Sequence, residues 1–512
     1  MTVKTKTPPL KEKLVVDSTM LEMPFPAEVL AEAEQTARQG AALIEAEAPK
    51  RRDFRGLPTF TIDPARAKDF DDALSVRLLP PGADGRPTYE IGVHIADVAF
   101  YVRPGTALDN EARKRATSIY LVDRVIPMLP PALSDDLCSL KPNEDRLAFS
   151  AVFTLDDQAN ILNEWFGRTV IRSSRRFTYE EVEKITLAGE GEYFAELHIL
   201  KTLAGCLDQK KIRAGALAFE EDEYLFEVDA EGKPISIIKE ERMVSHKLVE
   251  DFMLLANRQV AAHVSKLVKH RDHAFVYRIH DAPNPDKMND FINFIKLFGY
   301  RQFNGQRKLT PQILNAWLKT LAGKPEEDIL NDAAVRAMSR AAYSTKNIGH
   351  FGLAFKHYTH FTSPIRRYPD VLVHRLLDYY LRGQRLPEGW LAELDELCVK
   401  AGEREQFATV AERDSIKLAQ CRYLEEHQGK VFDGVVAWMA DFGLFIEELS
   451  TGARGLARFR NLPKDYYLFD EKKMVVSGKR TKKTFRLGDQ VKIRLLSADP
   501  VSRLIDFEVV LD

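Results

Sequence analysis

The spacing of apolar and polar positions changes twice along the chain, and it predicts three kinds of region. Between about residues 59 and 171, short apolar runs alternate with turn residues, as in β-strands. From Thr178 to about Gln420, apolar residues recur at helical spacing. After Lys430, short apolar runs return, separated by Gly and Asp. We therefore expect an α+β protein with a mixed sheet surrounded by helices, followed by a smaller β-domain.

The first region should contain five strands after an N-terminal helix. Residues 1–20 are expected to be a disordered leader, and Pro24 and Pro26 introduce a helix through about Ala46. The segment 50–56 is expected to be a basic linker. The expected strands are Thr59–Asp63, Ala73–Leu79, Tyr89–Val98, Phe149–Leu155 and Ile161–Ile171, the last two forming a hairpin.

The second region should be mainly helical. Thr178 is followed three residues later by Glu181, which is the pattern of a capping box at a helix start. A strand-like interruption is expected within 217–239. The clearest expected helices are Val244–His263, about 367–382 and about 389–426.

The third region contains five short apolar runs in about 80 residues, which predicts a small closed barrel of the OB type. Aromatic and basic residues interleave along it, which is typical of proteins that bind single-stranded nucleic acid. A solvated loop explains the lysine-rich run 479–483 equally well. The aromatic and basic residues are Trp438, Phe442, Phe445, Arg454, Arg458, Phe459, Arg460, Lys464, Tyr466 and Tyr467.

The composition is that of an ordinary globular protein, with 45% hydrophobic residues, 29% charged residues and a net charge of −2 over 512 residues. A net charge near zero does not exclude nucleic acid, because binding follows local clustering. The four cysteines include no CxxC pair, so we expect reduced thiols in a cytoplasmic protein. We expect no membrane segment, because no apolar run reaches about 18 residues.

Four aspartates fall within ten residues between two expected strands, in TIDPARAKDFDDA at 61–73. They are Asp63, Asp69, Asp71 and Asp72. Like charges this close repel one another, so folding them together without a counter-charge is costly. Oxygen ligands of this kind suit Mg²⁺ or Mn²⁺. The pattern therefore indicates a divalent-metal site for phosphoryl chemistry, with a solvated acidic loop as the alternative.

A second candidate is TSPIRRYPD at 362–370, which places Arg366 and Arg367 where Pro364 permits a helix to begin. Helix N-termini bind anions, and two arginines there would strengthen a phosphate site. The alternative is a capped helix whose arginines pair with nearby carboxylates.

Isolated aromatic and histidine residues give weaker signals. Tyr120 and Phe219 each follow an irregular segment, and their rings would be able to stack on exposed bases. An ordinary core position is the alternative for both. For His94 and His350 we favour a core or supporting position over direct metal ligation.

In six ordered motifs the sequence resembles the ribonuclease II / ribonuclease R (RNB) family of 3′→5′ exoribonucleases, with ribonuclease R the closer branch. The resemblance runs from about residue 50 to the end of the chain. The motifs are TIDPARAKDFDDA at 61–73, HIADVAFYV at 94–102, PMLPPALSDDLCSL at 127–140, FTSPIRRYPD at 361–370, AERDS at 411–415 and VFDGVVAWMADFGLFIEE at 431–448.

The resemblance implies a processive exoribonuclease that hydrolyses single-stranded RNA, and duplex RNA with a 3′ overhang, to nucleoside 5′-monophosphates. It implies a monomer that uses Mg²⁺, with Mn²⁺ as the alternative cofactor. The implied domains are a leader and helix at 1–50, an RNB catalytic domain at 51–428 and an S1-type OB barrel at 429–512. Family members carry two cold-shock-type barrels before the catalytic domain, and the first 50 residues leave no room for them. A catalytically silent RNA-binding relative is the alternative.

The resemblance also implies roles for individual residues. The four aspartates would hold one or two metal ions, Asp69 and Asp71 would also act in catalysis, and Arg366 would stabilise charge on the phosphate. The implied RNA contacts are Arg366, Arg367, Tyr120, Phe219, Tyr179, Glu250 and Glu412, with Tyr179 and Glu250 at ribose 2′-hydroxyls. The role of Glu250 is left open between it and the neighbouring Asp251.

Overall fold

The computed structural model describes residues 23–510 except 83–84, 218–222, 241, 268–273, 302–309, 325, 385, 387–388 and 472. The expected leader at 1–20 and the candidate Phe219 therefore lie outside the described residues.

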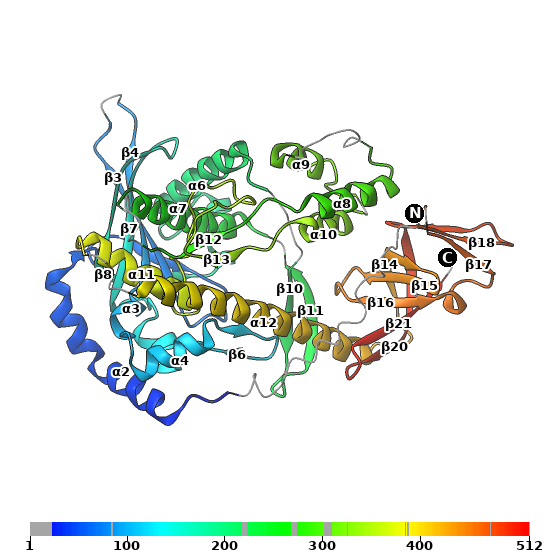
Figure 1. Ribbon diagram of the computed structural model, residues 1–512, viewed down its shortest axis with the longest axis horizontal. Coiled ribbons are helices and arrows are strands. Elements are labelled where there is room, and N and C mark those ends of the chain that lie inside the picture. The colour runs from blue at the N-terminus through cyan, green and yellow to red at the C-terminus, as the bar shows by residue number, and fades with distance from the viewer. Residues whose placement is uncertain are drawn as a thin grey trace.

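A mixed seven-stranded sheet, built from residues 52–177, is surrounded by most of the helices (Figure 1). Its strand order is β1-β8-β7-β4-β3-β2-β9. The edge pairs β1–β8 and β2–β9 are parallel and the others antiparallel, so the expected mixed sheet is confirmed. The strands are β1 Arg52–Asp53, β2 Thr59–Ile62, β3 Asp72–Leu79, β4 Thr88–Ala96, β7 Asp145–Asp156, β8 Ile161–Arg172 and β9 Arg175–Phe177.

Helices cover this sheet, as expected. α2 packs on β7, α6 on β3 and α7 on β4, while the long α12 crosses the molecule toward the C-terminal barrel (Figure 1). The capping box predicted at Thr178 is present and starts α5. The helices are α2 Ala27–Glu47, α3 Val98–Tyr101, α4 Ala107–Arg115, α5 Tyr179–Ala188, α6 Phe194–Ala214, α7 Val244–Leu267, α8 Pro285–Leu297, α9 Pro311–Leu318, α10 Glu327–Ala337, α11 Tyr368–Leu381 and α12 Trp390–Glu425.

Three two-stranded ribbons connect these elements. The strand-like interruption expected within 217–239 is the hairpin β10–β11, which lies between the sheet and the barrel (Figure 1). The ribbons are β5 Ile119–Tyr120 with β6 Val125–Ile126, β10 Glu223–Val228 with β11 Pro234–Glu240, and β12 Tyr277–Ile279 with β13 Ala342–Ser344.

The C-terminal strands close into a five-stranded barrel, as the apolar runs predicted. Strands β16 and β21 approach each other closely, since a Cβ added to Gly455 would lie 2.7 Å from the carbonyl oxygen of Ile505. A three-stranded sheet between β16 and β20 was not expected, because its strands are only three or four residues long and lysine-rich turns separate them. The strands are β14 Val431–Ala440, β15 Gly443–Glu448, β16 Arg454–Arg458, β17 Tyr467–Asp470, β18 Val475–Gly478, β19 Thr484–Arg486, β20 Gln490–Asp499 and β21 Leu504–Val510.

The expectation of a basic linker at 50–56 is wrong. Its residues Arg52–Asp53 form β1, and Arg51 is buried with its Nη1 2.7 Å from Oδ2 of the fully buried Asp97. Arg168 lies 3.5 Å from the same carboxylate. A basic run of this kind is typical of a solvated segment. Arg51 of this run is nevertheless in the core, because Asp97, distant in the sequence, supplies the counter-charge.

We predict that Asp97→Asn lowers the free energy of unfolding by about 3–5 kcal/mol, because it removes the buried negative charge that Arg51 and Arg168 share and leaves Arg51 only the more distant Glu47, 3.6 Å away. Asp53→Asn removes an exposed partner of Arg55 instead and should cost less than about 1 kcal/mol. Urea unfolding of both variants measures the difference. Equal losses would contradict a special role for the buried pair.

Candidate active site

Asp63, Asp69 and Asp71 lie on the loop between β2 and β3, and Asp72 is the first residue of β3, so the sheet fixes both ends of the loop. The backbone N–H of Asp63 donates to the carbonyl of Phe177 at the end of β9, 3.1 Å away. At the other end, the N–H of Ala96 in β4 donates to the carbonyl of Asp71. The aspartates are therefore held at one end of the four neighbouring strands β4, β3, β2 and β9, close to the buried Phe70.

The middle of this loop is held by a buried residue that sequence reasoning did not single out. The hydroxyl of Ser139 accepts from the N–H of Phe70 at 3.0 Å and donates to the carbonyl of Lys68 at 2.7 Å. Ser139 is fully buried. A polar residue between Cys138 and Leu140 in an apolar stretch was the only signal available in the sequence.

Burial dominates the electrostatics of the aspartates. It raises the pKa of Asp69 and raises that of Asp71 well above its ordinary value. Burial also raises the pKa of Asp63 and Asp72, and the charge of Asp72 raises that of Asp63 further. These shifts mean that burial outweighs the positive charge that reaches the carboxylates from this chain.

The side chain of Arg366 supplies positive charge at this site. Its charge lowers the pKa of Asp69, Asp71 and Asp72, against the larger effect of burial. Its turn is attached directly to the aspartate loop, because the N–H of Ile365 donates to Asp71 Oδ1 at 2.8 Å. The guanidinium is exposed and makes one hydrogen bond, to the hydroxyl of Ser363.

Arg367 has a different environment, and here the alternative that the sequence left open is observed. Its Nε and Nη2 bond both oxygens of the buried Asp370, at 2.9 and 2.8 Å. Helix α11 begins only at Tyr368, and Asp370 in its first turn also accepts from the N–H of Ser363. This carboxylate therefore neutralises the helix start that we expected to bind an anion.

Tyr120 joins the aspartates from a separate part of the chain. Its hydroxyl donates to Asp69 Oδ2 at 3.3 Å, and its backbone N–H donates to Glu412 Oε1 of α12 at 3.1 Å. The tyrosine is 39% exposed, so its ring keeps a free surface beside the carboxylates. Burial raises the pKa of Glu412.

Tyr179 opens α5 directly after β9, on the same side of the sheet as Asp63. Burial raises the pKa of its hydroxyl, and so do the charges of Asp72 and Asp63, which lie within electrostatic reach. Among the candidate residues from the sequence, the structure therefore brings together the four aspartates, Arg366, Tyr120, Tyr179 and Glu412.

Glu250 and Asp251 differ in their surroundings. Asp251 is buried, and the ammonium of Lys211 donates to it at 2.8 Å. Glu250 is more exposed and pairs with Arg242, with Lys211 3.7 Å away. Between the two neighbours, Glu250 is the one with a side chain accessible to a ligand.

The two histidines are placed as we favoured. His94 is fully buried between the hydroxyls of Ser75 and Ser150, at 2.8 and 2.7 Å, and burial lowers its pKa to about 3. His350 accepts from the N–H of Leu353 through Nδ1 and packs on His280. Both occupy packing positions.

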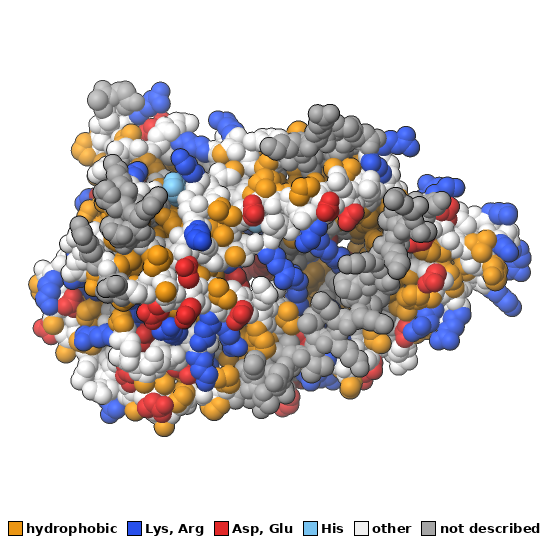
Figure 2. Space-filling view, in the orientation of Figure 1, with side chains coloured by type: hydrophobic (Ala, Val, Ile, Leu, Met, Phe, Trp, Pro, Cys, Tyr) orange, Lys and Arg blue, Asp and Glu red, His pale blue; other side chains and the backbone are white. Residues whose placement is uncertain are grey.

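The basic and aromatic residues predicted for the barrel differ in their surroundings. Some are exposed at the surface, and others pack against neighbouring side chains. Figure 2 shows Lys and Arg side chains gathered at the end of the molecule where Figure 1 places β17 and β18. Tyr466 is 64% exposed there, with Lys479 Nζ 4.7 Å from the centre of its ring. Trp438 instead stacks on Phe294 of α8, so it joins the barrel to the rest of the chain.

The aspartates fit a divalent cation by their chemistry. Asp63 Oδ2 is buried and has no hydrogen-bond partner among the described residues. A hard cation would satisfy this oxygen and remove the repulsion among carboxylates of raised pKa. Within the described ranges, no group of three or more His, Cys, Asp and Glu side chains has the arrangement of a metal site.

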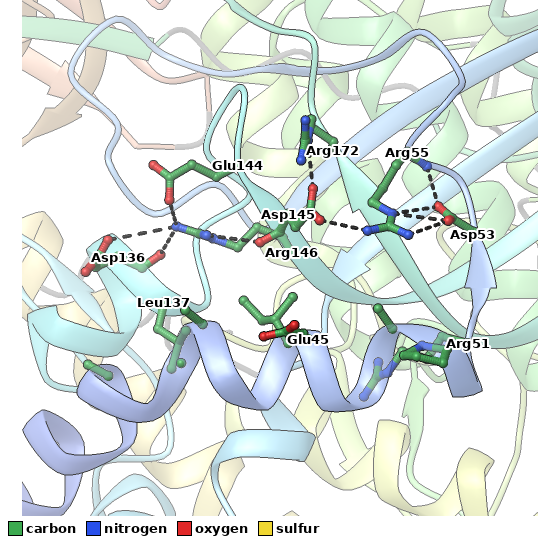
Figure 3. Close-up of a pocket in the computed structure, with 16 residues that line it drawn as sticks. Glu45, Arg51, Asp53, Arg55, Asp136, Leu137, Glu144, Asp145, Arg146 and Arg172 are labelled. Carbon is green, nitrogen blue, oxygen red and sulfur yellow. Dashed lines mark hydrogen bonds and ion pairs between the residues drawn. The ribbon is translucent and has the colours of Figure 1, made fainter.

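A cavity of about 820 Å³ lies elsewhere, between α2 and the ends of β1, β7 and β8 (Figure 3). Its charged side chains pair with one another: Arg55 with Asp53, Arg172 with Asp145 and Arg146 with Glu144. Glu45 also lines the cavity, and Figure 3 marks no contact of its carboxylate with the other residues drawn.

Buried carboxylates beside an exposed arginine, on a sheet joined to an OB-type barrel, define the architecture of a nuclease. A family model for the RNB domain matches residues 51–383. The chain belongs to this family. Across the described residues, no helix has the combination of length and apolar character that crossing a membrane requires.

The most informative relatives are ribonucleases R. Ribonuclease R of Aquifex aeolicus is 37% identical over 504 residues, which are 97% of this chain and 70% of that protein. Ribonuclease R of Escherichia coli is 34% identical over 497 residues, which are 93% of this chain and 60% of that protein. The chain thus spans 60–70% of the length of these two relatives.

Solved structures share the fold. Mycoplasma genitalium RNase R in complex with ribose-methylated single-stranded RNA matches with a TM-score of 0.80 and 26% identity, over 94% of this chain and 78% of that one. Yeast Ssd1, a pseudonuclease, matches with a TM-score of 0.69 and 21% identity, over 84% of this chain and 53% of that one. Because a pseudonuclease shares the fold, activity must be argued from the site residues.

We predict that Ser139→Ala weakens Mn²⁺ binding by about 10-fold, because groups that orient ligand-bearing segments affect metal affinity on this scale. Ser150→Ala is the matched control, since this serine is equally buried and its hydroxyl also has two partners, but these are the side chains of His94 and Thr169 and not the aspartate loop. Calorimetric Mn²⁺ titration compares them. Equal weakening in both variants would show that stability alone is responsible.

Proposed function

We propose that this chain is a 3′→5′ exoribonuclease that hydrolyses single-stranded RNA to nucleoside 5′-monophosphates. The observation that carries the proposal is the set of four aspartates with raised pKa values facing the exposed Arg366, in a chain of the RNB family. The pseudonuclease alternative is not favoured, because the chain keeps the whole carboxylate set.

Asp63, Asp69, Asp71 and Asp72 would hold one or two Mg²⁺, with Mn²⁺ as the alternative. Bound there, such an ion supplies Lewis-acid stabilisation of the phosphate and a more acidic water. Asp63 and Asp72 are our choice for the most direct ligands, since the unpartnered oxygen belongs to Asp63 and the charge of Asp72 acts on it. Asp69 and Asp71 would serve a second ion or orient the attacking water.

The remaining side chains bind and orient the 3′ end. Arg366 would neutralise charge that develops on the phosphate, and loss of such a donor costs on the order of 10²–10³ in rate. Tyr120 would stack on the terminal base while its hydroxyl holds Asp69. Glu412 supports this arrangement through the backbone of Tyr120.

Recognition of RNA over DNA would depend on ribose contacts. Tyr179 and Glu250 are proposed to contact 2′-hydroxyls, the groups that distinguish RNA from DNA. We propose that Arg367, whose guanidinium is engaged by Asp370, acts on RNA by supporting the turn that carries Arg366. Phe219 stays a prediction for the far end of the stacked nucleotides.

The larger organisation is proposed on the same basis. An S1-type barrel at 429–512 would bind the RNA and pass it to an RNB catalytic domain at 51–428. The exposed Tyr466 and the basic loop of the barrel suit single strands. Duplex RNA with a 3′ overhang is a further proposed substrate. A monomeric state and a cytoplasmic location stay predictions.

We predict that Asp71→Asn retains RNA affinity within about threefold but slows hydrolysis at least about 10²-fold. Loss of a residue that only supports a metal ligand costs up to about 10²-fold, and loss of a ligand itself should cost at least as much. The asparagine oxygen still accepts from Ile365, so the Arg366 turn should stay in place. Filter binding in EDTA and product gels with Mg²⁺ separate the two effects.

The matched control is Asp123→Asn, which removes an exposed charge paired with Arg124 on the β5–β6 turn. It should change neither quantity. Parallel loss of affinity and rate in Asp71→Asn would argue against a metal-ligand role for this aspartate.

We predict that Tyr120→Ala changes the length of the final RNA product, because a stacked base contributes roughly 1–3 kcal/mol to holding a short strand. Tyr120→Phe keeps the ring and loses only the bond to Asp69, so its product length should match that of the parent protein. Sequencing gels of exhaustive digests provide the measurement, and an unchanged product from the alanine variant would exclude the stacking role.

A further inference from the structure

The imidazole of His246 lies face to face with the ring of Tyr179. Their centroids are 3.9 Å apart and their planes differ by 22°. Tyr179 is the first residue of α5, and His246 lies in the first turn of α7. None of the roles proposed above uses this histidine.

The backbone of Tyr179 is fixed, but its ring needs a separate support. The preceding Thr178 and the following Glu181 form the capping box, with bonds of 3.2 and 2.8 Å. The hydroxyl of Tyr179 has no hydrogen-bond partner within the described ranges. The direction of its ring therefore depends on what packs against its face.

His246 is itself held in place by neighbouring groups. Its Nδ1 accepts from the N–H of Met243 at 3.3 Å, and its second nitrogen lies 3.7 Å from Oε1 of Glu240. The backbone N–H of Ser245, the residue before His246, donates to the carboxylate of Glu183 in α5 at 3.1 Å and so links helices α5 and α7. The imidazole thus forms a fixed surface against the tyrosine.

The stacked tyrosine lies next to the catalytic carboxylates. The charges of Asp72 and Asp63 act on its hydroxyl, and together with burial they keep its pKa high, so it stays protonated. A phenol in that state donates a hydrogen bond, and a ribose 2′-hydroxyl is able to accept one.

We propose that His246 is a positioning residue for sugar recognition: its stacked ring sets the direction of Tyr179, and the hydroxyl of Tyr179 then distinguishes ribose from deoxyribose. The inference rests on the proposed function and deepens it. The histidine contacts neither the substrate nor the reacting atoms, and it acts through the tyrosine.

The test is binding in EDTA of an RNA oligomer and of the same oligomer with deoxyribose in its last few nucleotides, measured by fluorescence anisotropy. His246→Ala should lower the preference for ribose by about 2- to 12-fold, the range that corresponds to one aromatic stack. His246→Leu, which fills the space without a ring, should show the same loss. His246→Phe should restore the preference to within about twofold.

His198→Ala is the control, because it removes a comparable ring contact, to Phe194 of α6. It should leave the ribose preference unchanged. The inference is overturned if His246→Ala keeps the full preference, or if His246→Phe loses as much as His246→Ala. Thermal melts confirm that each variant is folded before it is compared.

A wild-type assay separates this inference from the proposed function. If wild-type protein with Mg²⁺ does not hydrolyse the RNA oligomer, the proposed function fails. If it hydrolyses RNA but binds both oligomers equally well, the sugar-recognition inference fails alone. The expected result is hydrolysis of RNA with a clear preference for the ribose end.

Discussion

The burial of four carboxylates in one short loop is the constraint on which the rest of the structure depends. Burial raises the pKa of each, and Arg366 and Arg176 offset only part of this effect. Such an arrangement is stable with all carboxylates ionised only if a cation joins it. The buried carboxylates therefore favour the binding of a cation at the place where a phosphate would be attacked.

The sheet and the loops around it maintain this arrangement from distant parts of the chain. Ser139 holds the middle of the loop, and Ile365 holds Asp71. α12 contributes Glu412, which fixes Tyr120 about 290 residues away in the sequence. In each of these contacts one partner is a backbone N–H: those of Phe70 and Tyr120 donate to the supporting side chains, whereas that of Ile365 donates to the carboxylate of Asp71 itself.

Much of this was predictable from the sequence, because strands, turns and a dense acidic motif have local signatures. The expected strands around the aspartates, the capping box at Thr178 and the C-terminal barrel are confirmed. What failed depended on partners far along the chain. Within the segment 50–56, Arg51 is part of the core because Asp97 neutralises it, and Arg367 is engaged by Asp370.

The support provided by Ser139 and by the His246 ring had no local signature either. A serine in an apolar run and a histidine near a helix start are both common. Their importance follows only from which backbone or ring lies opposite them in space. Sequence motifs identify the groups that react, whereas the groups that hold them become visible only with the fold.

The central claim is that these carboxylates, once loaded with metal, remove nucleotides from the 3′ end of RNA. The most direct test compares one single-stranded RNA labelled at either its 5′ or its 3′ end, incubated with the protein in Mg²⁺ or in EDTA. We expect the 3′ label to be released at once as a mononucleotide while the 5′-labelled strand shortens progressively, and we expect EDTA to stop both. Mononucleotide release from the 5′ label, internal cleavage, or unchanged activity in EDTA would contradict it.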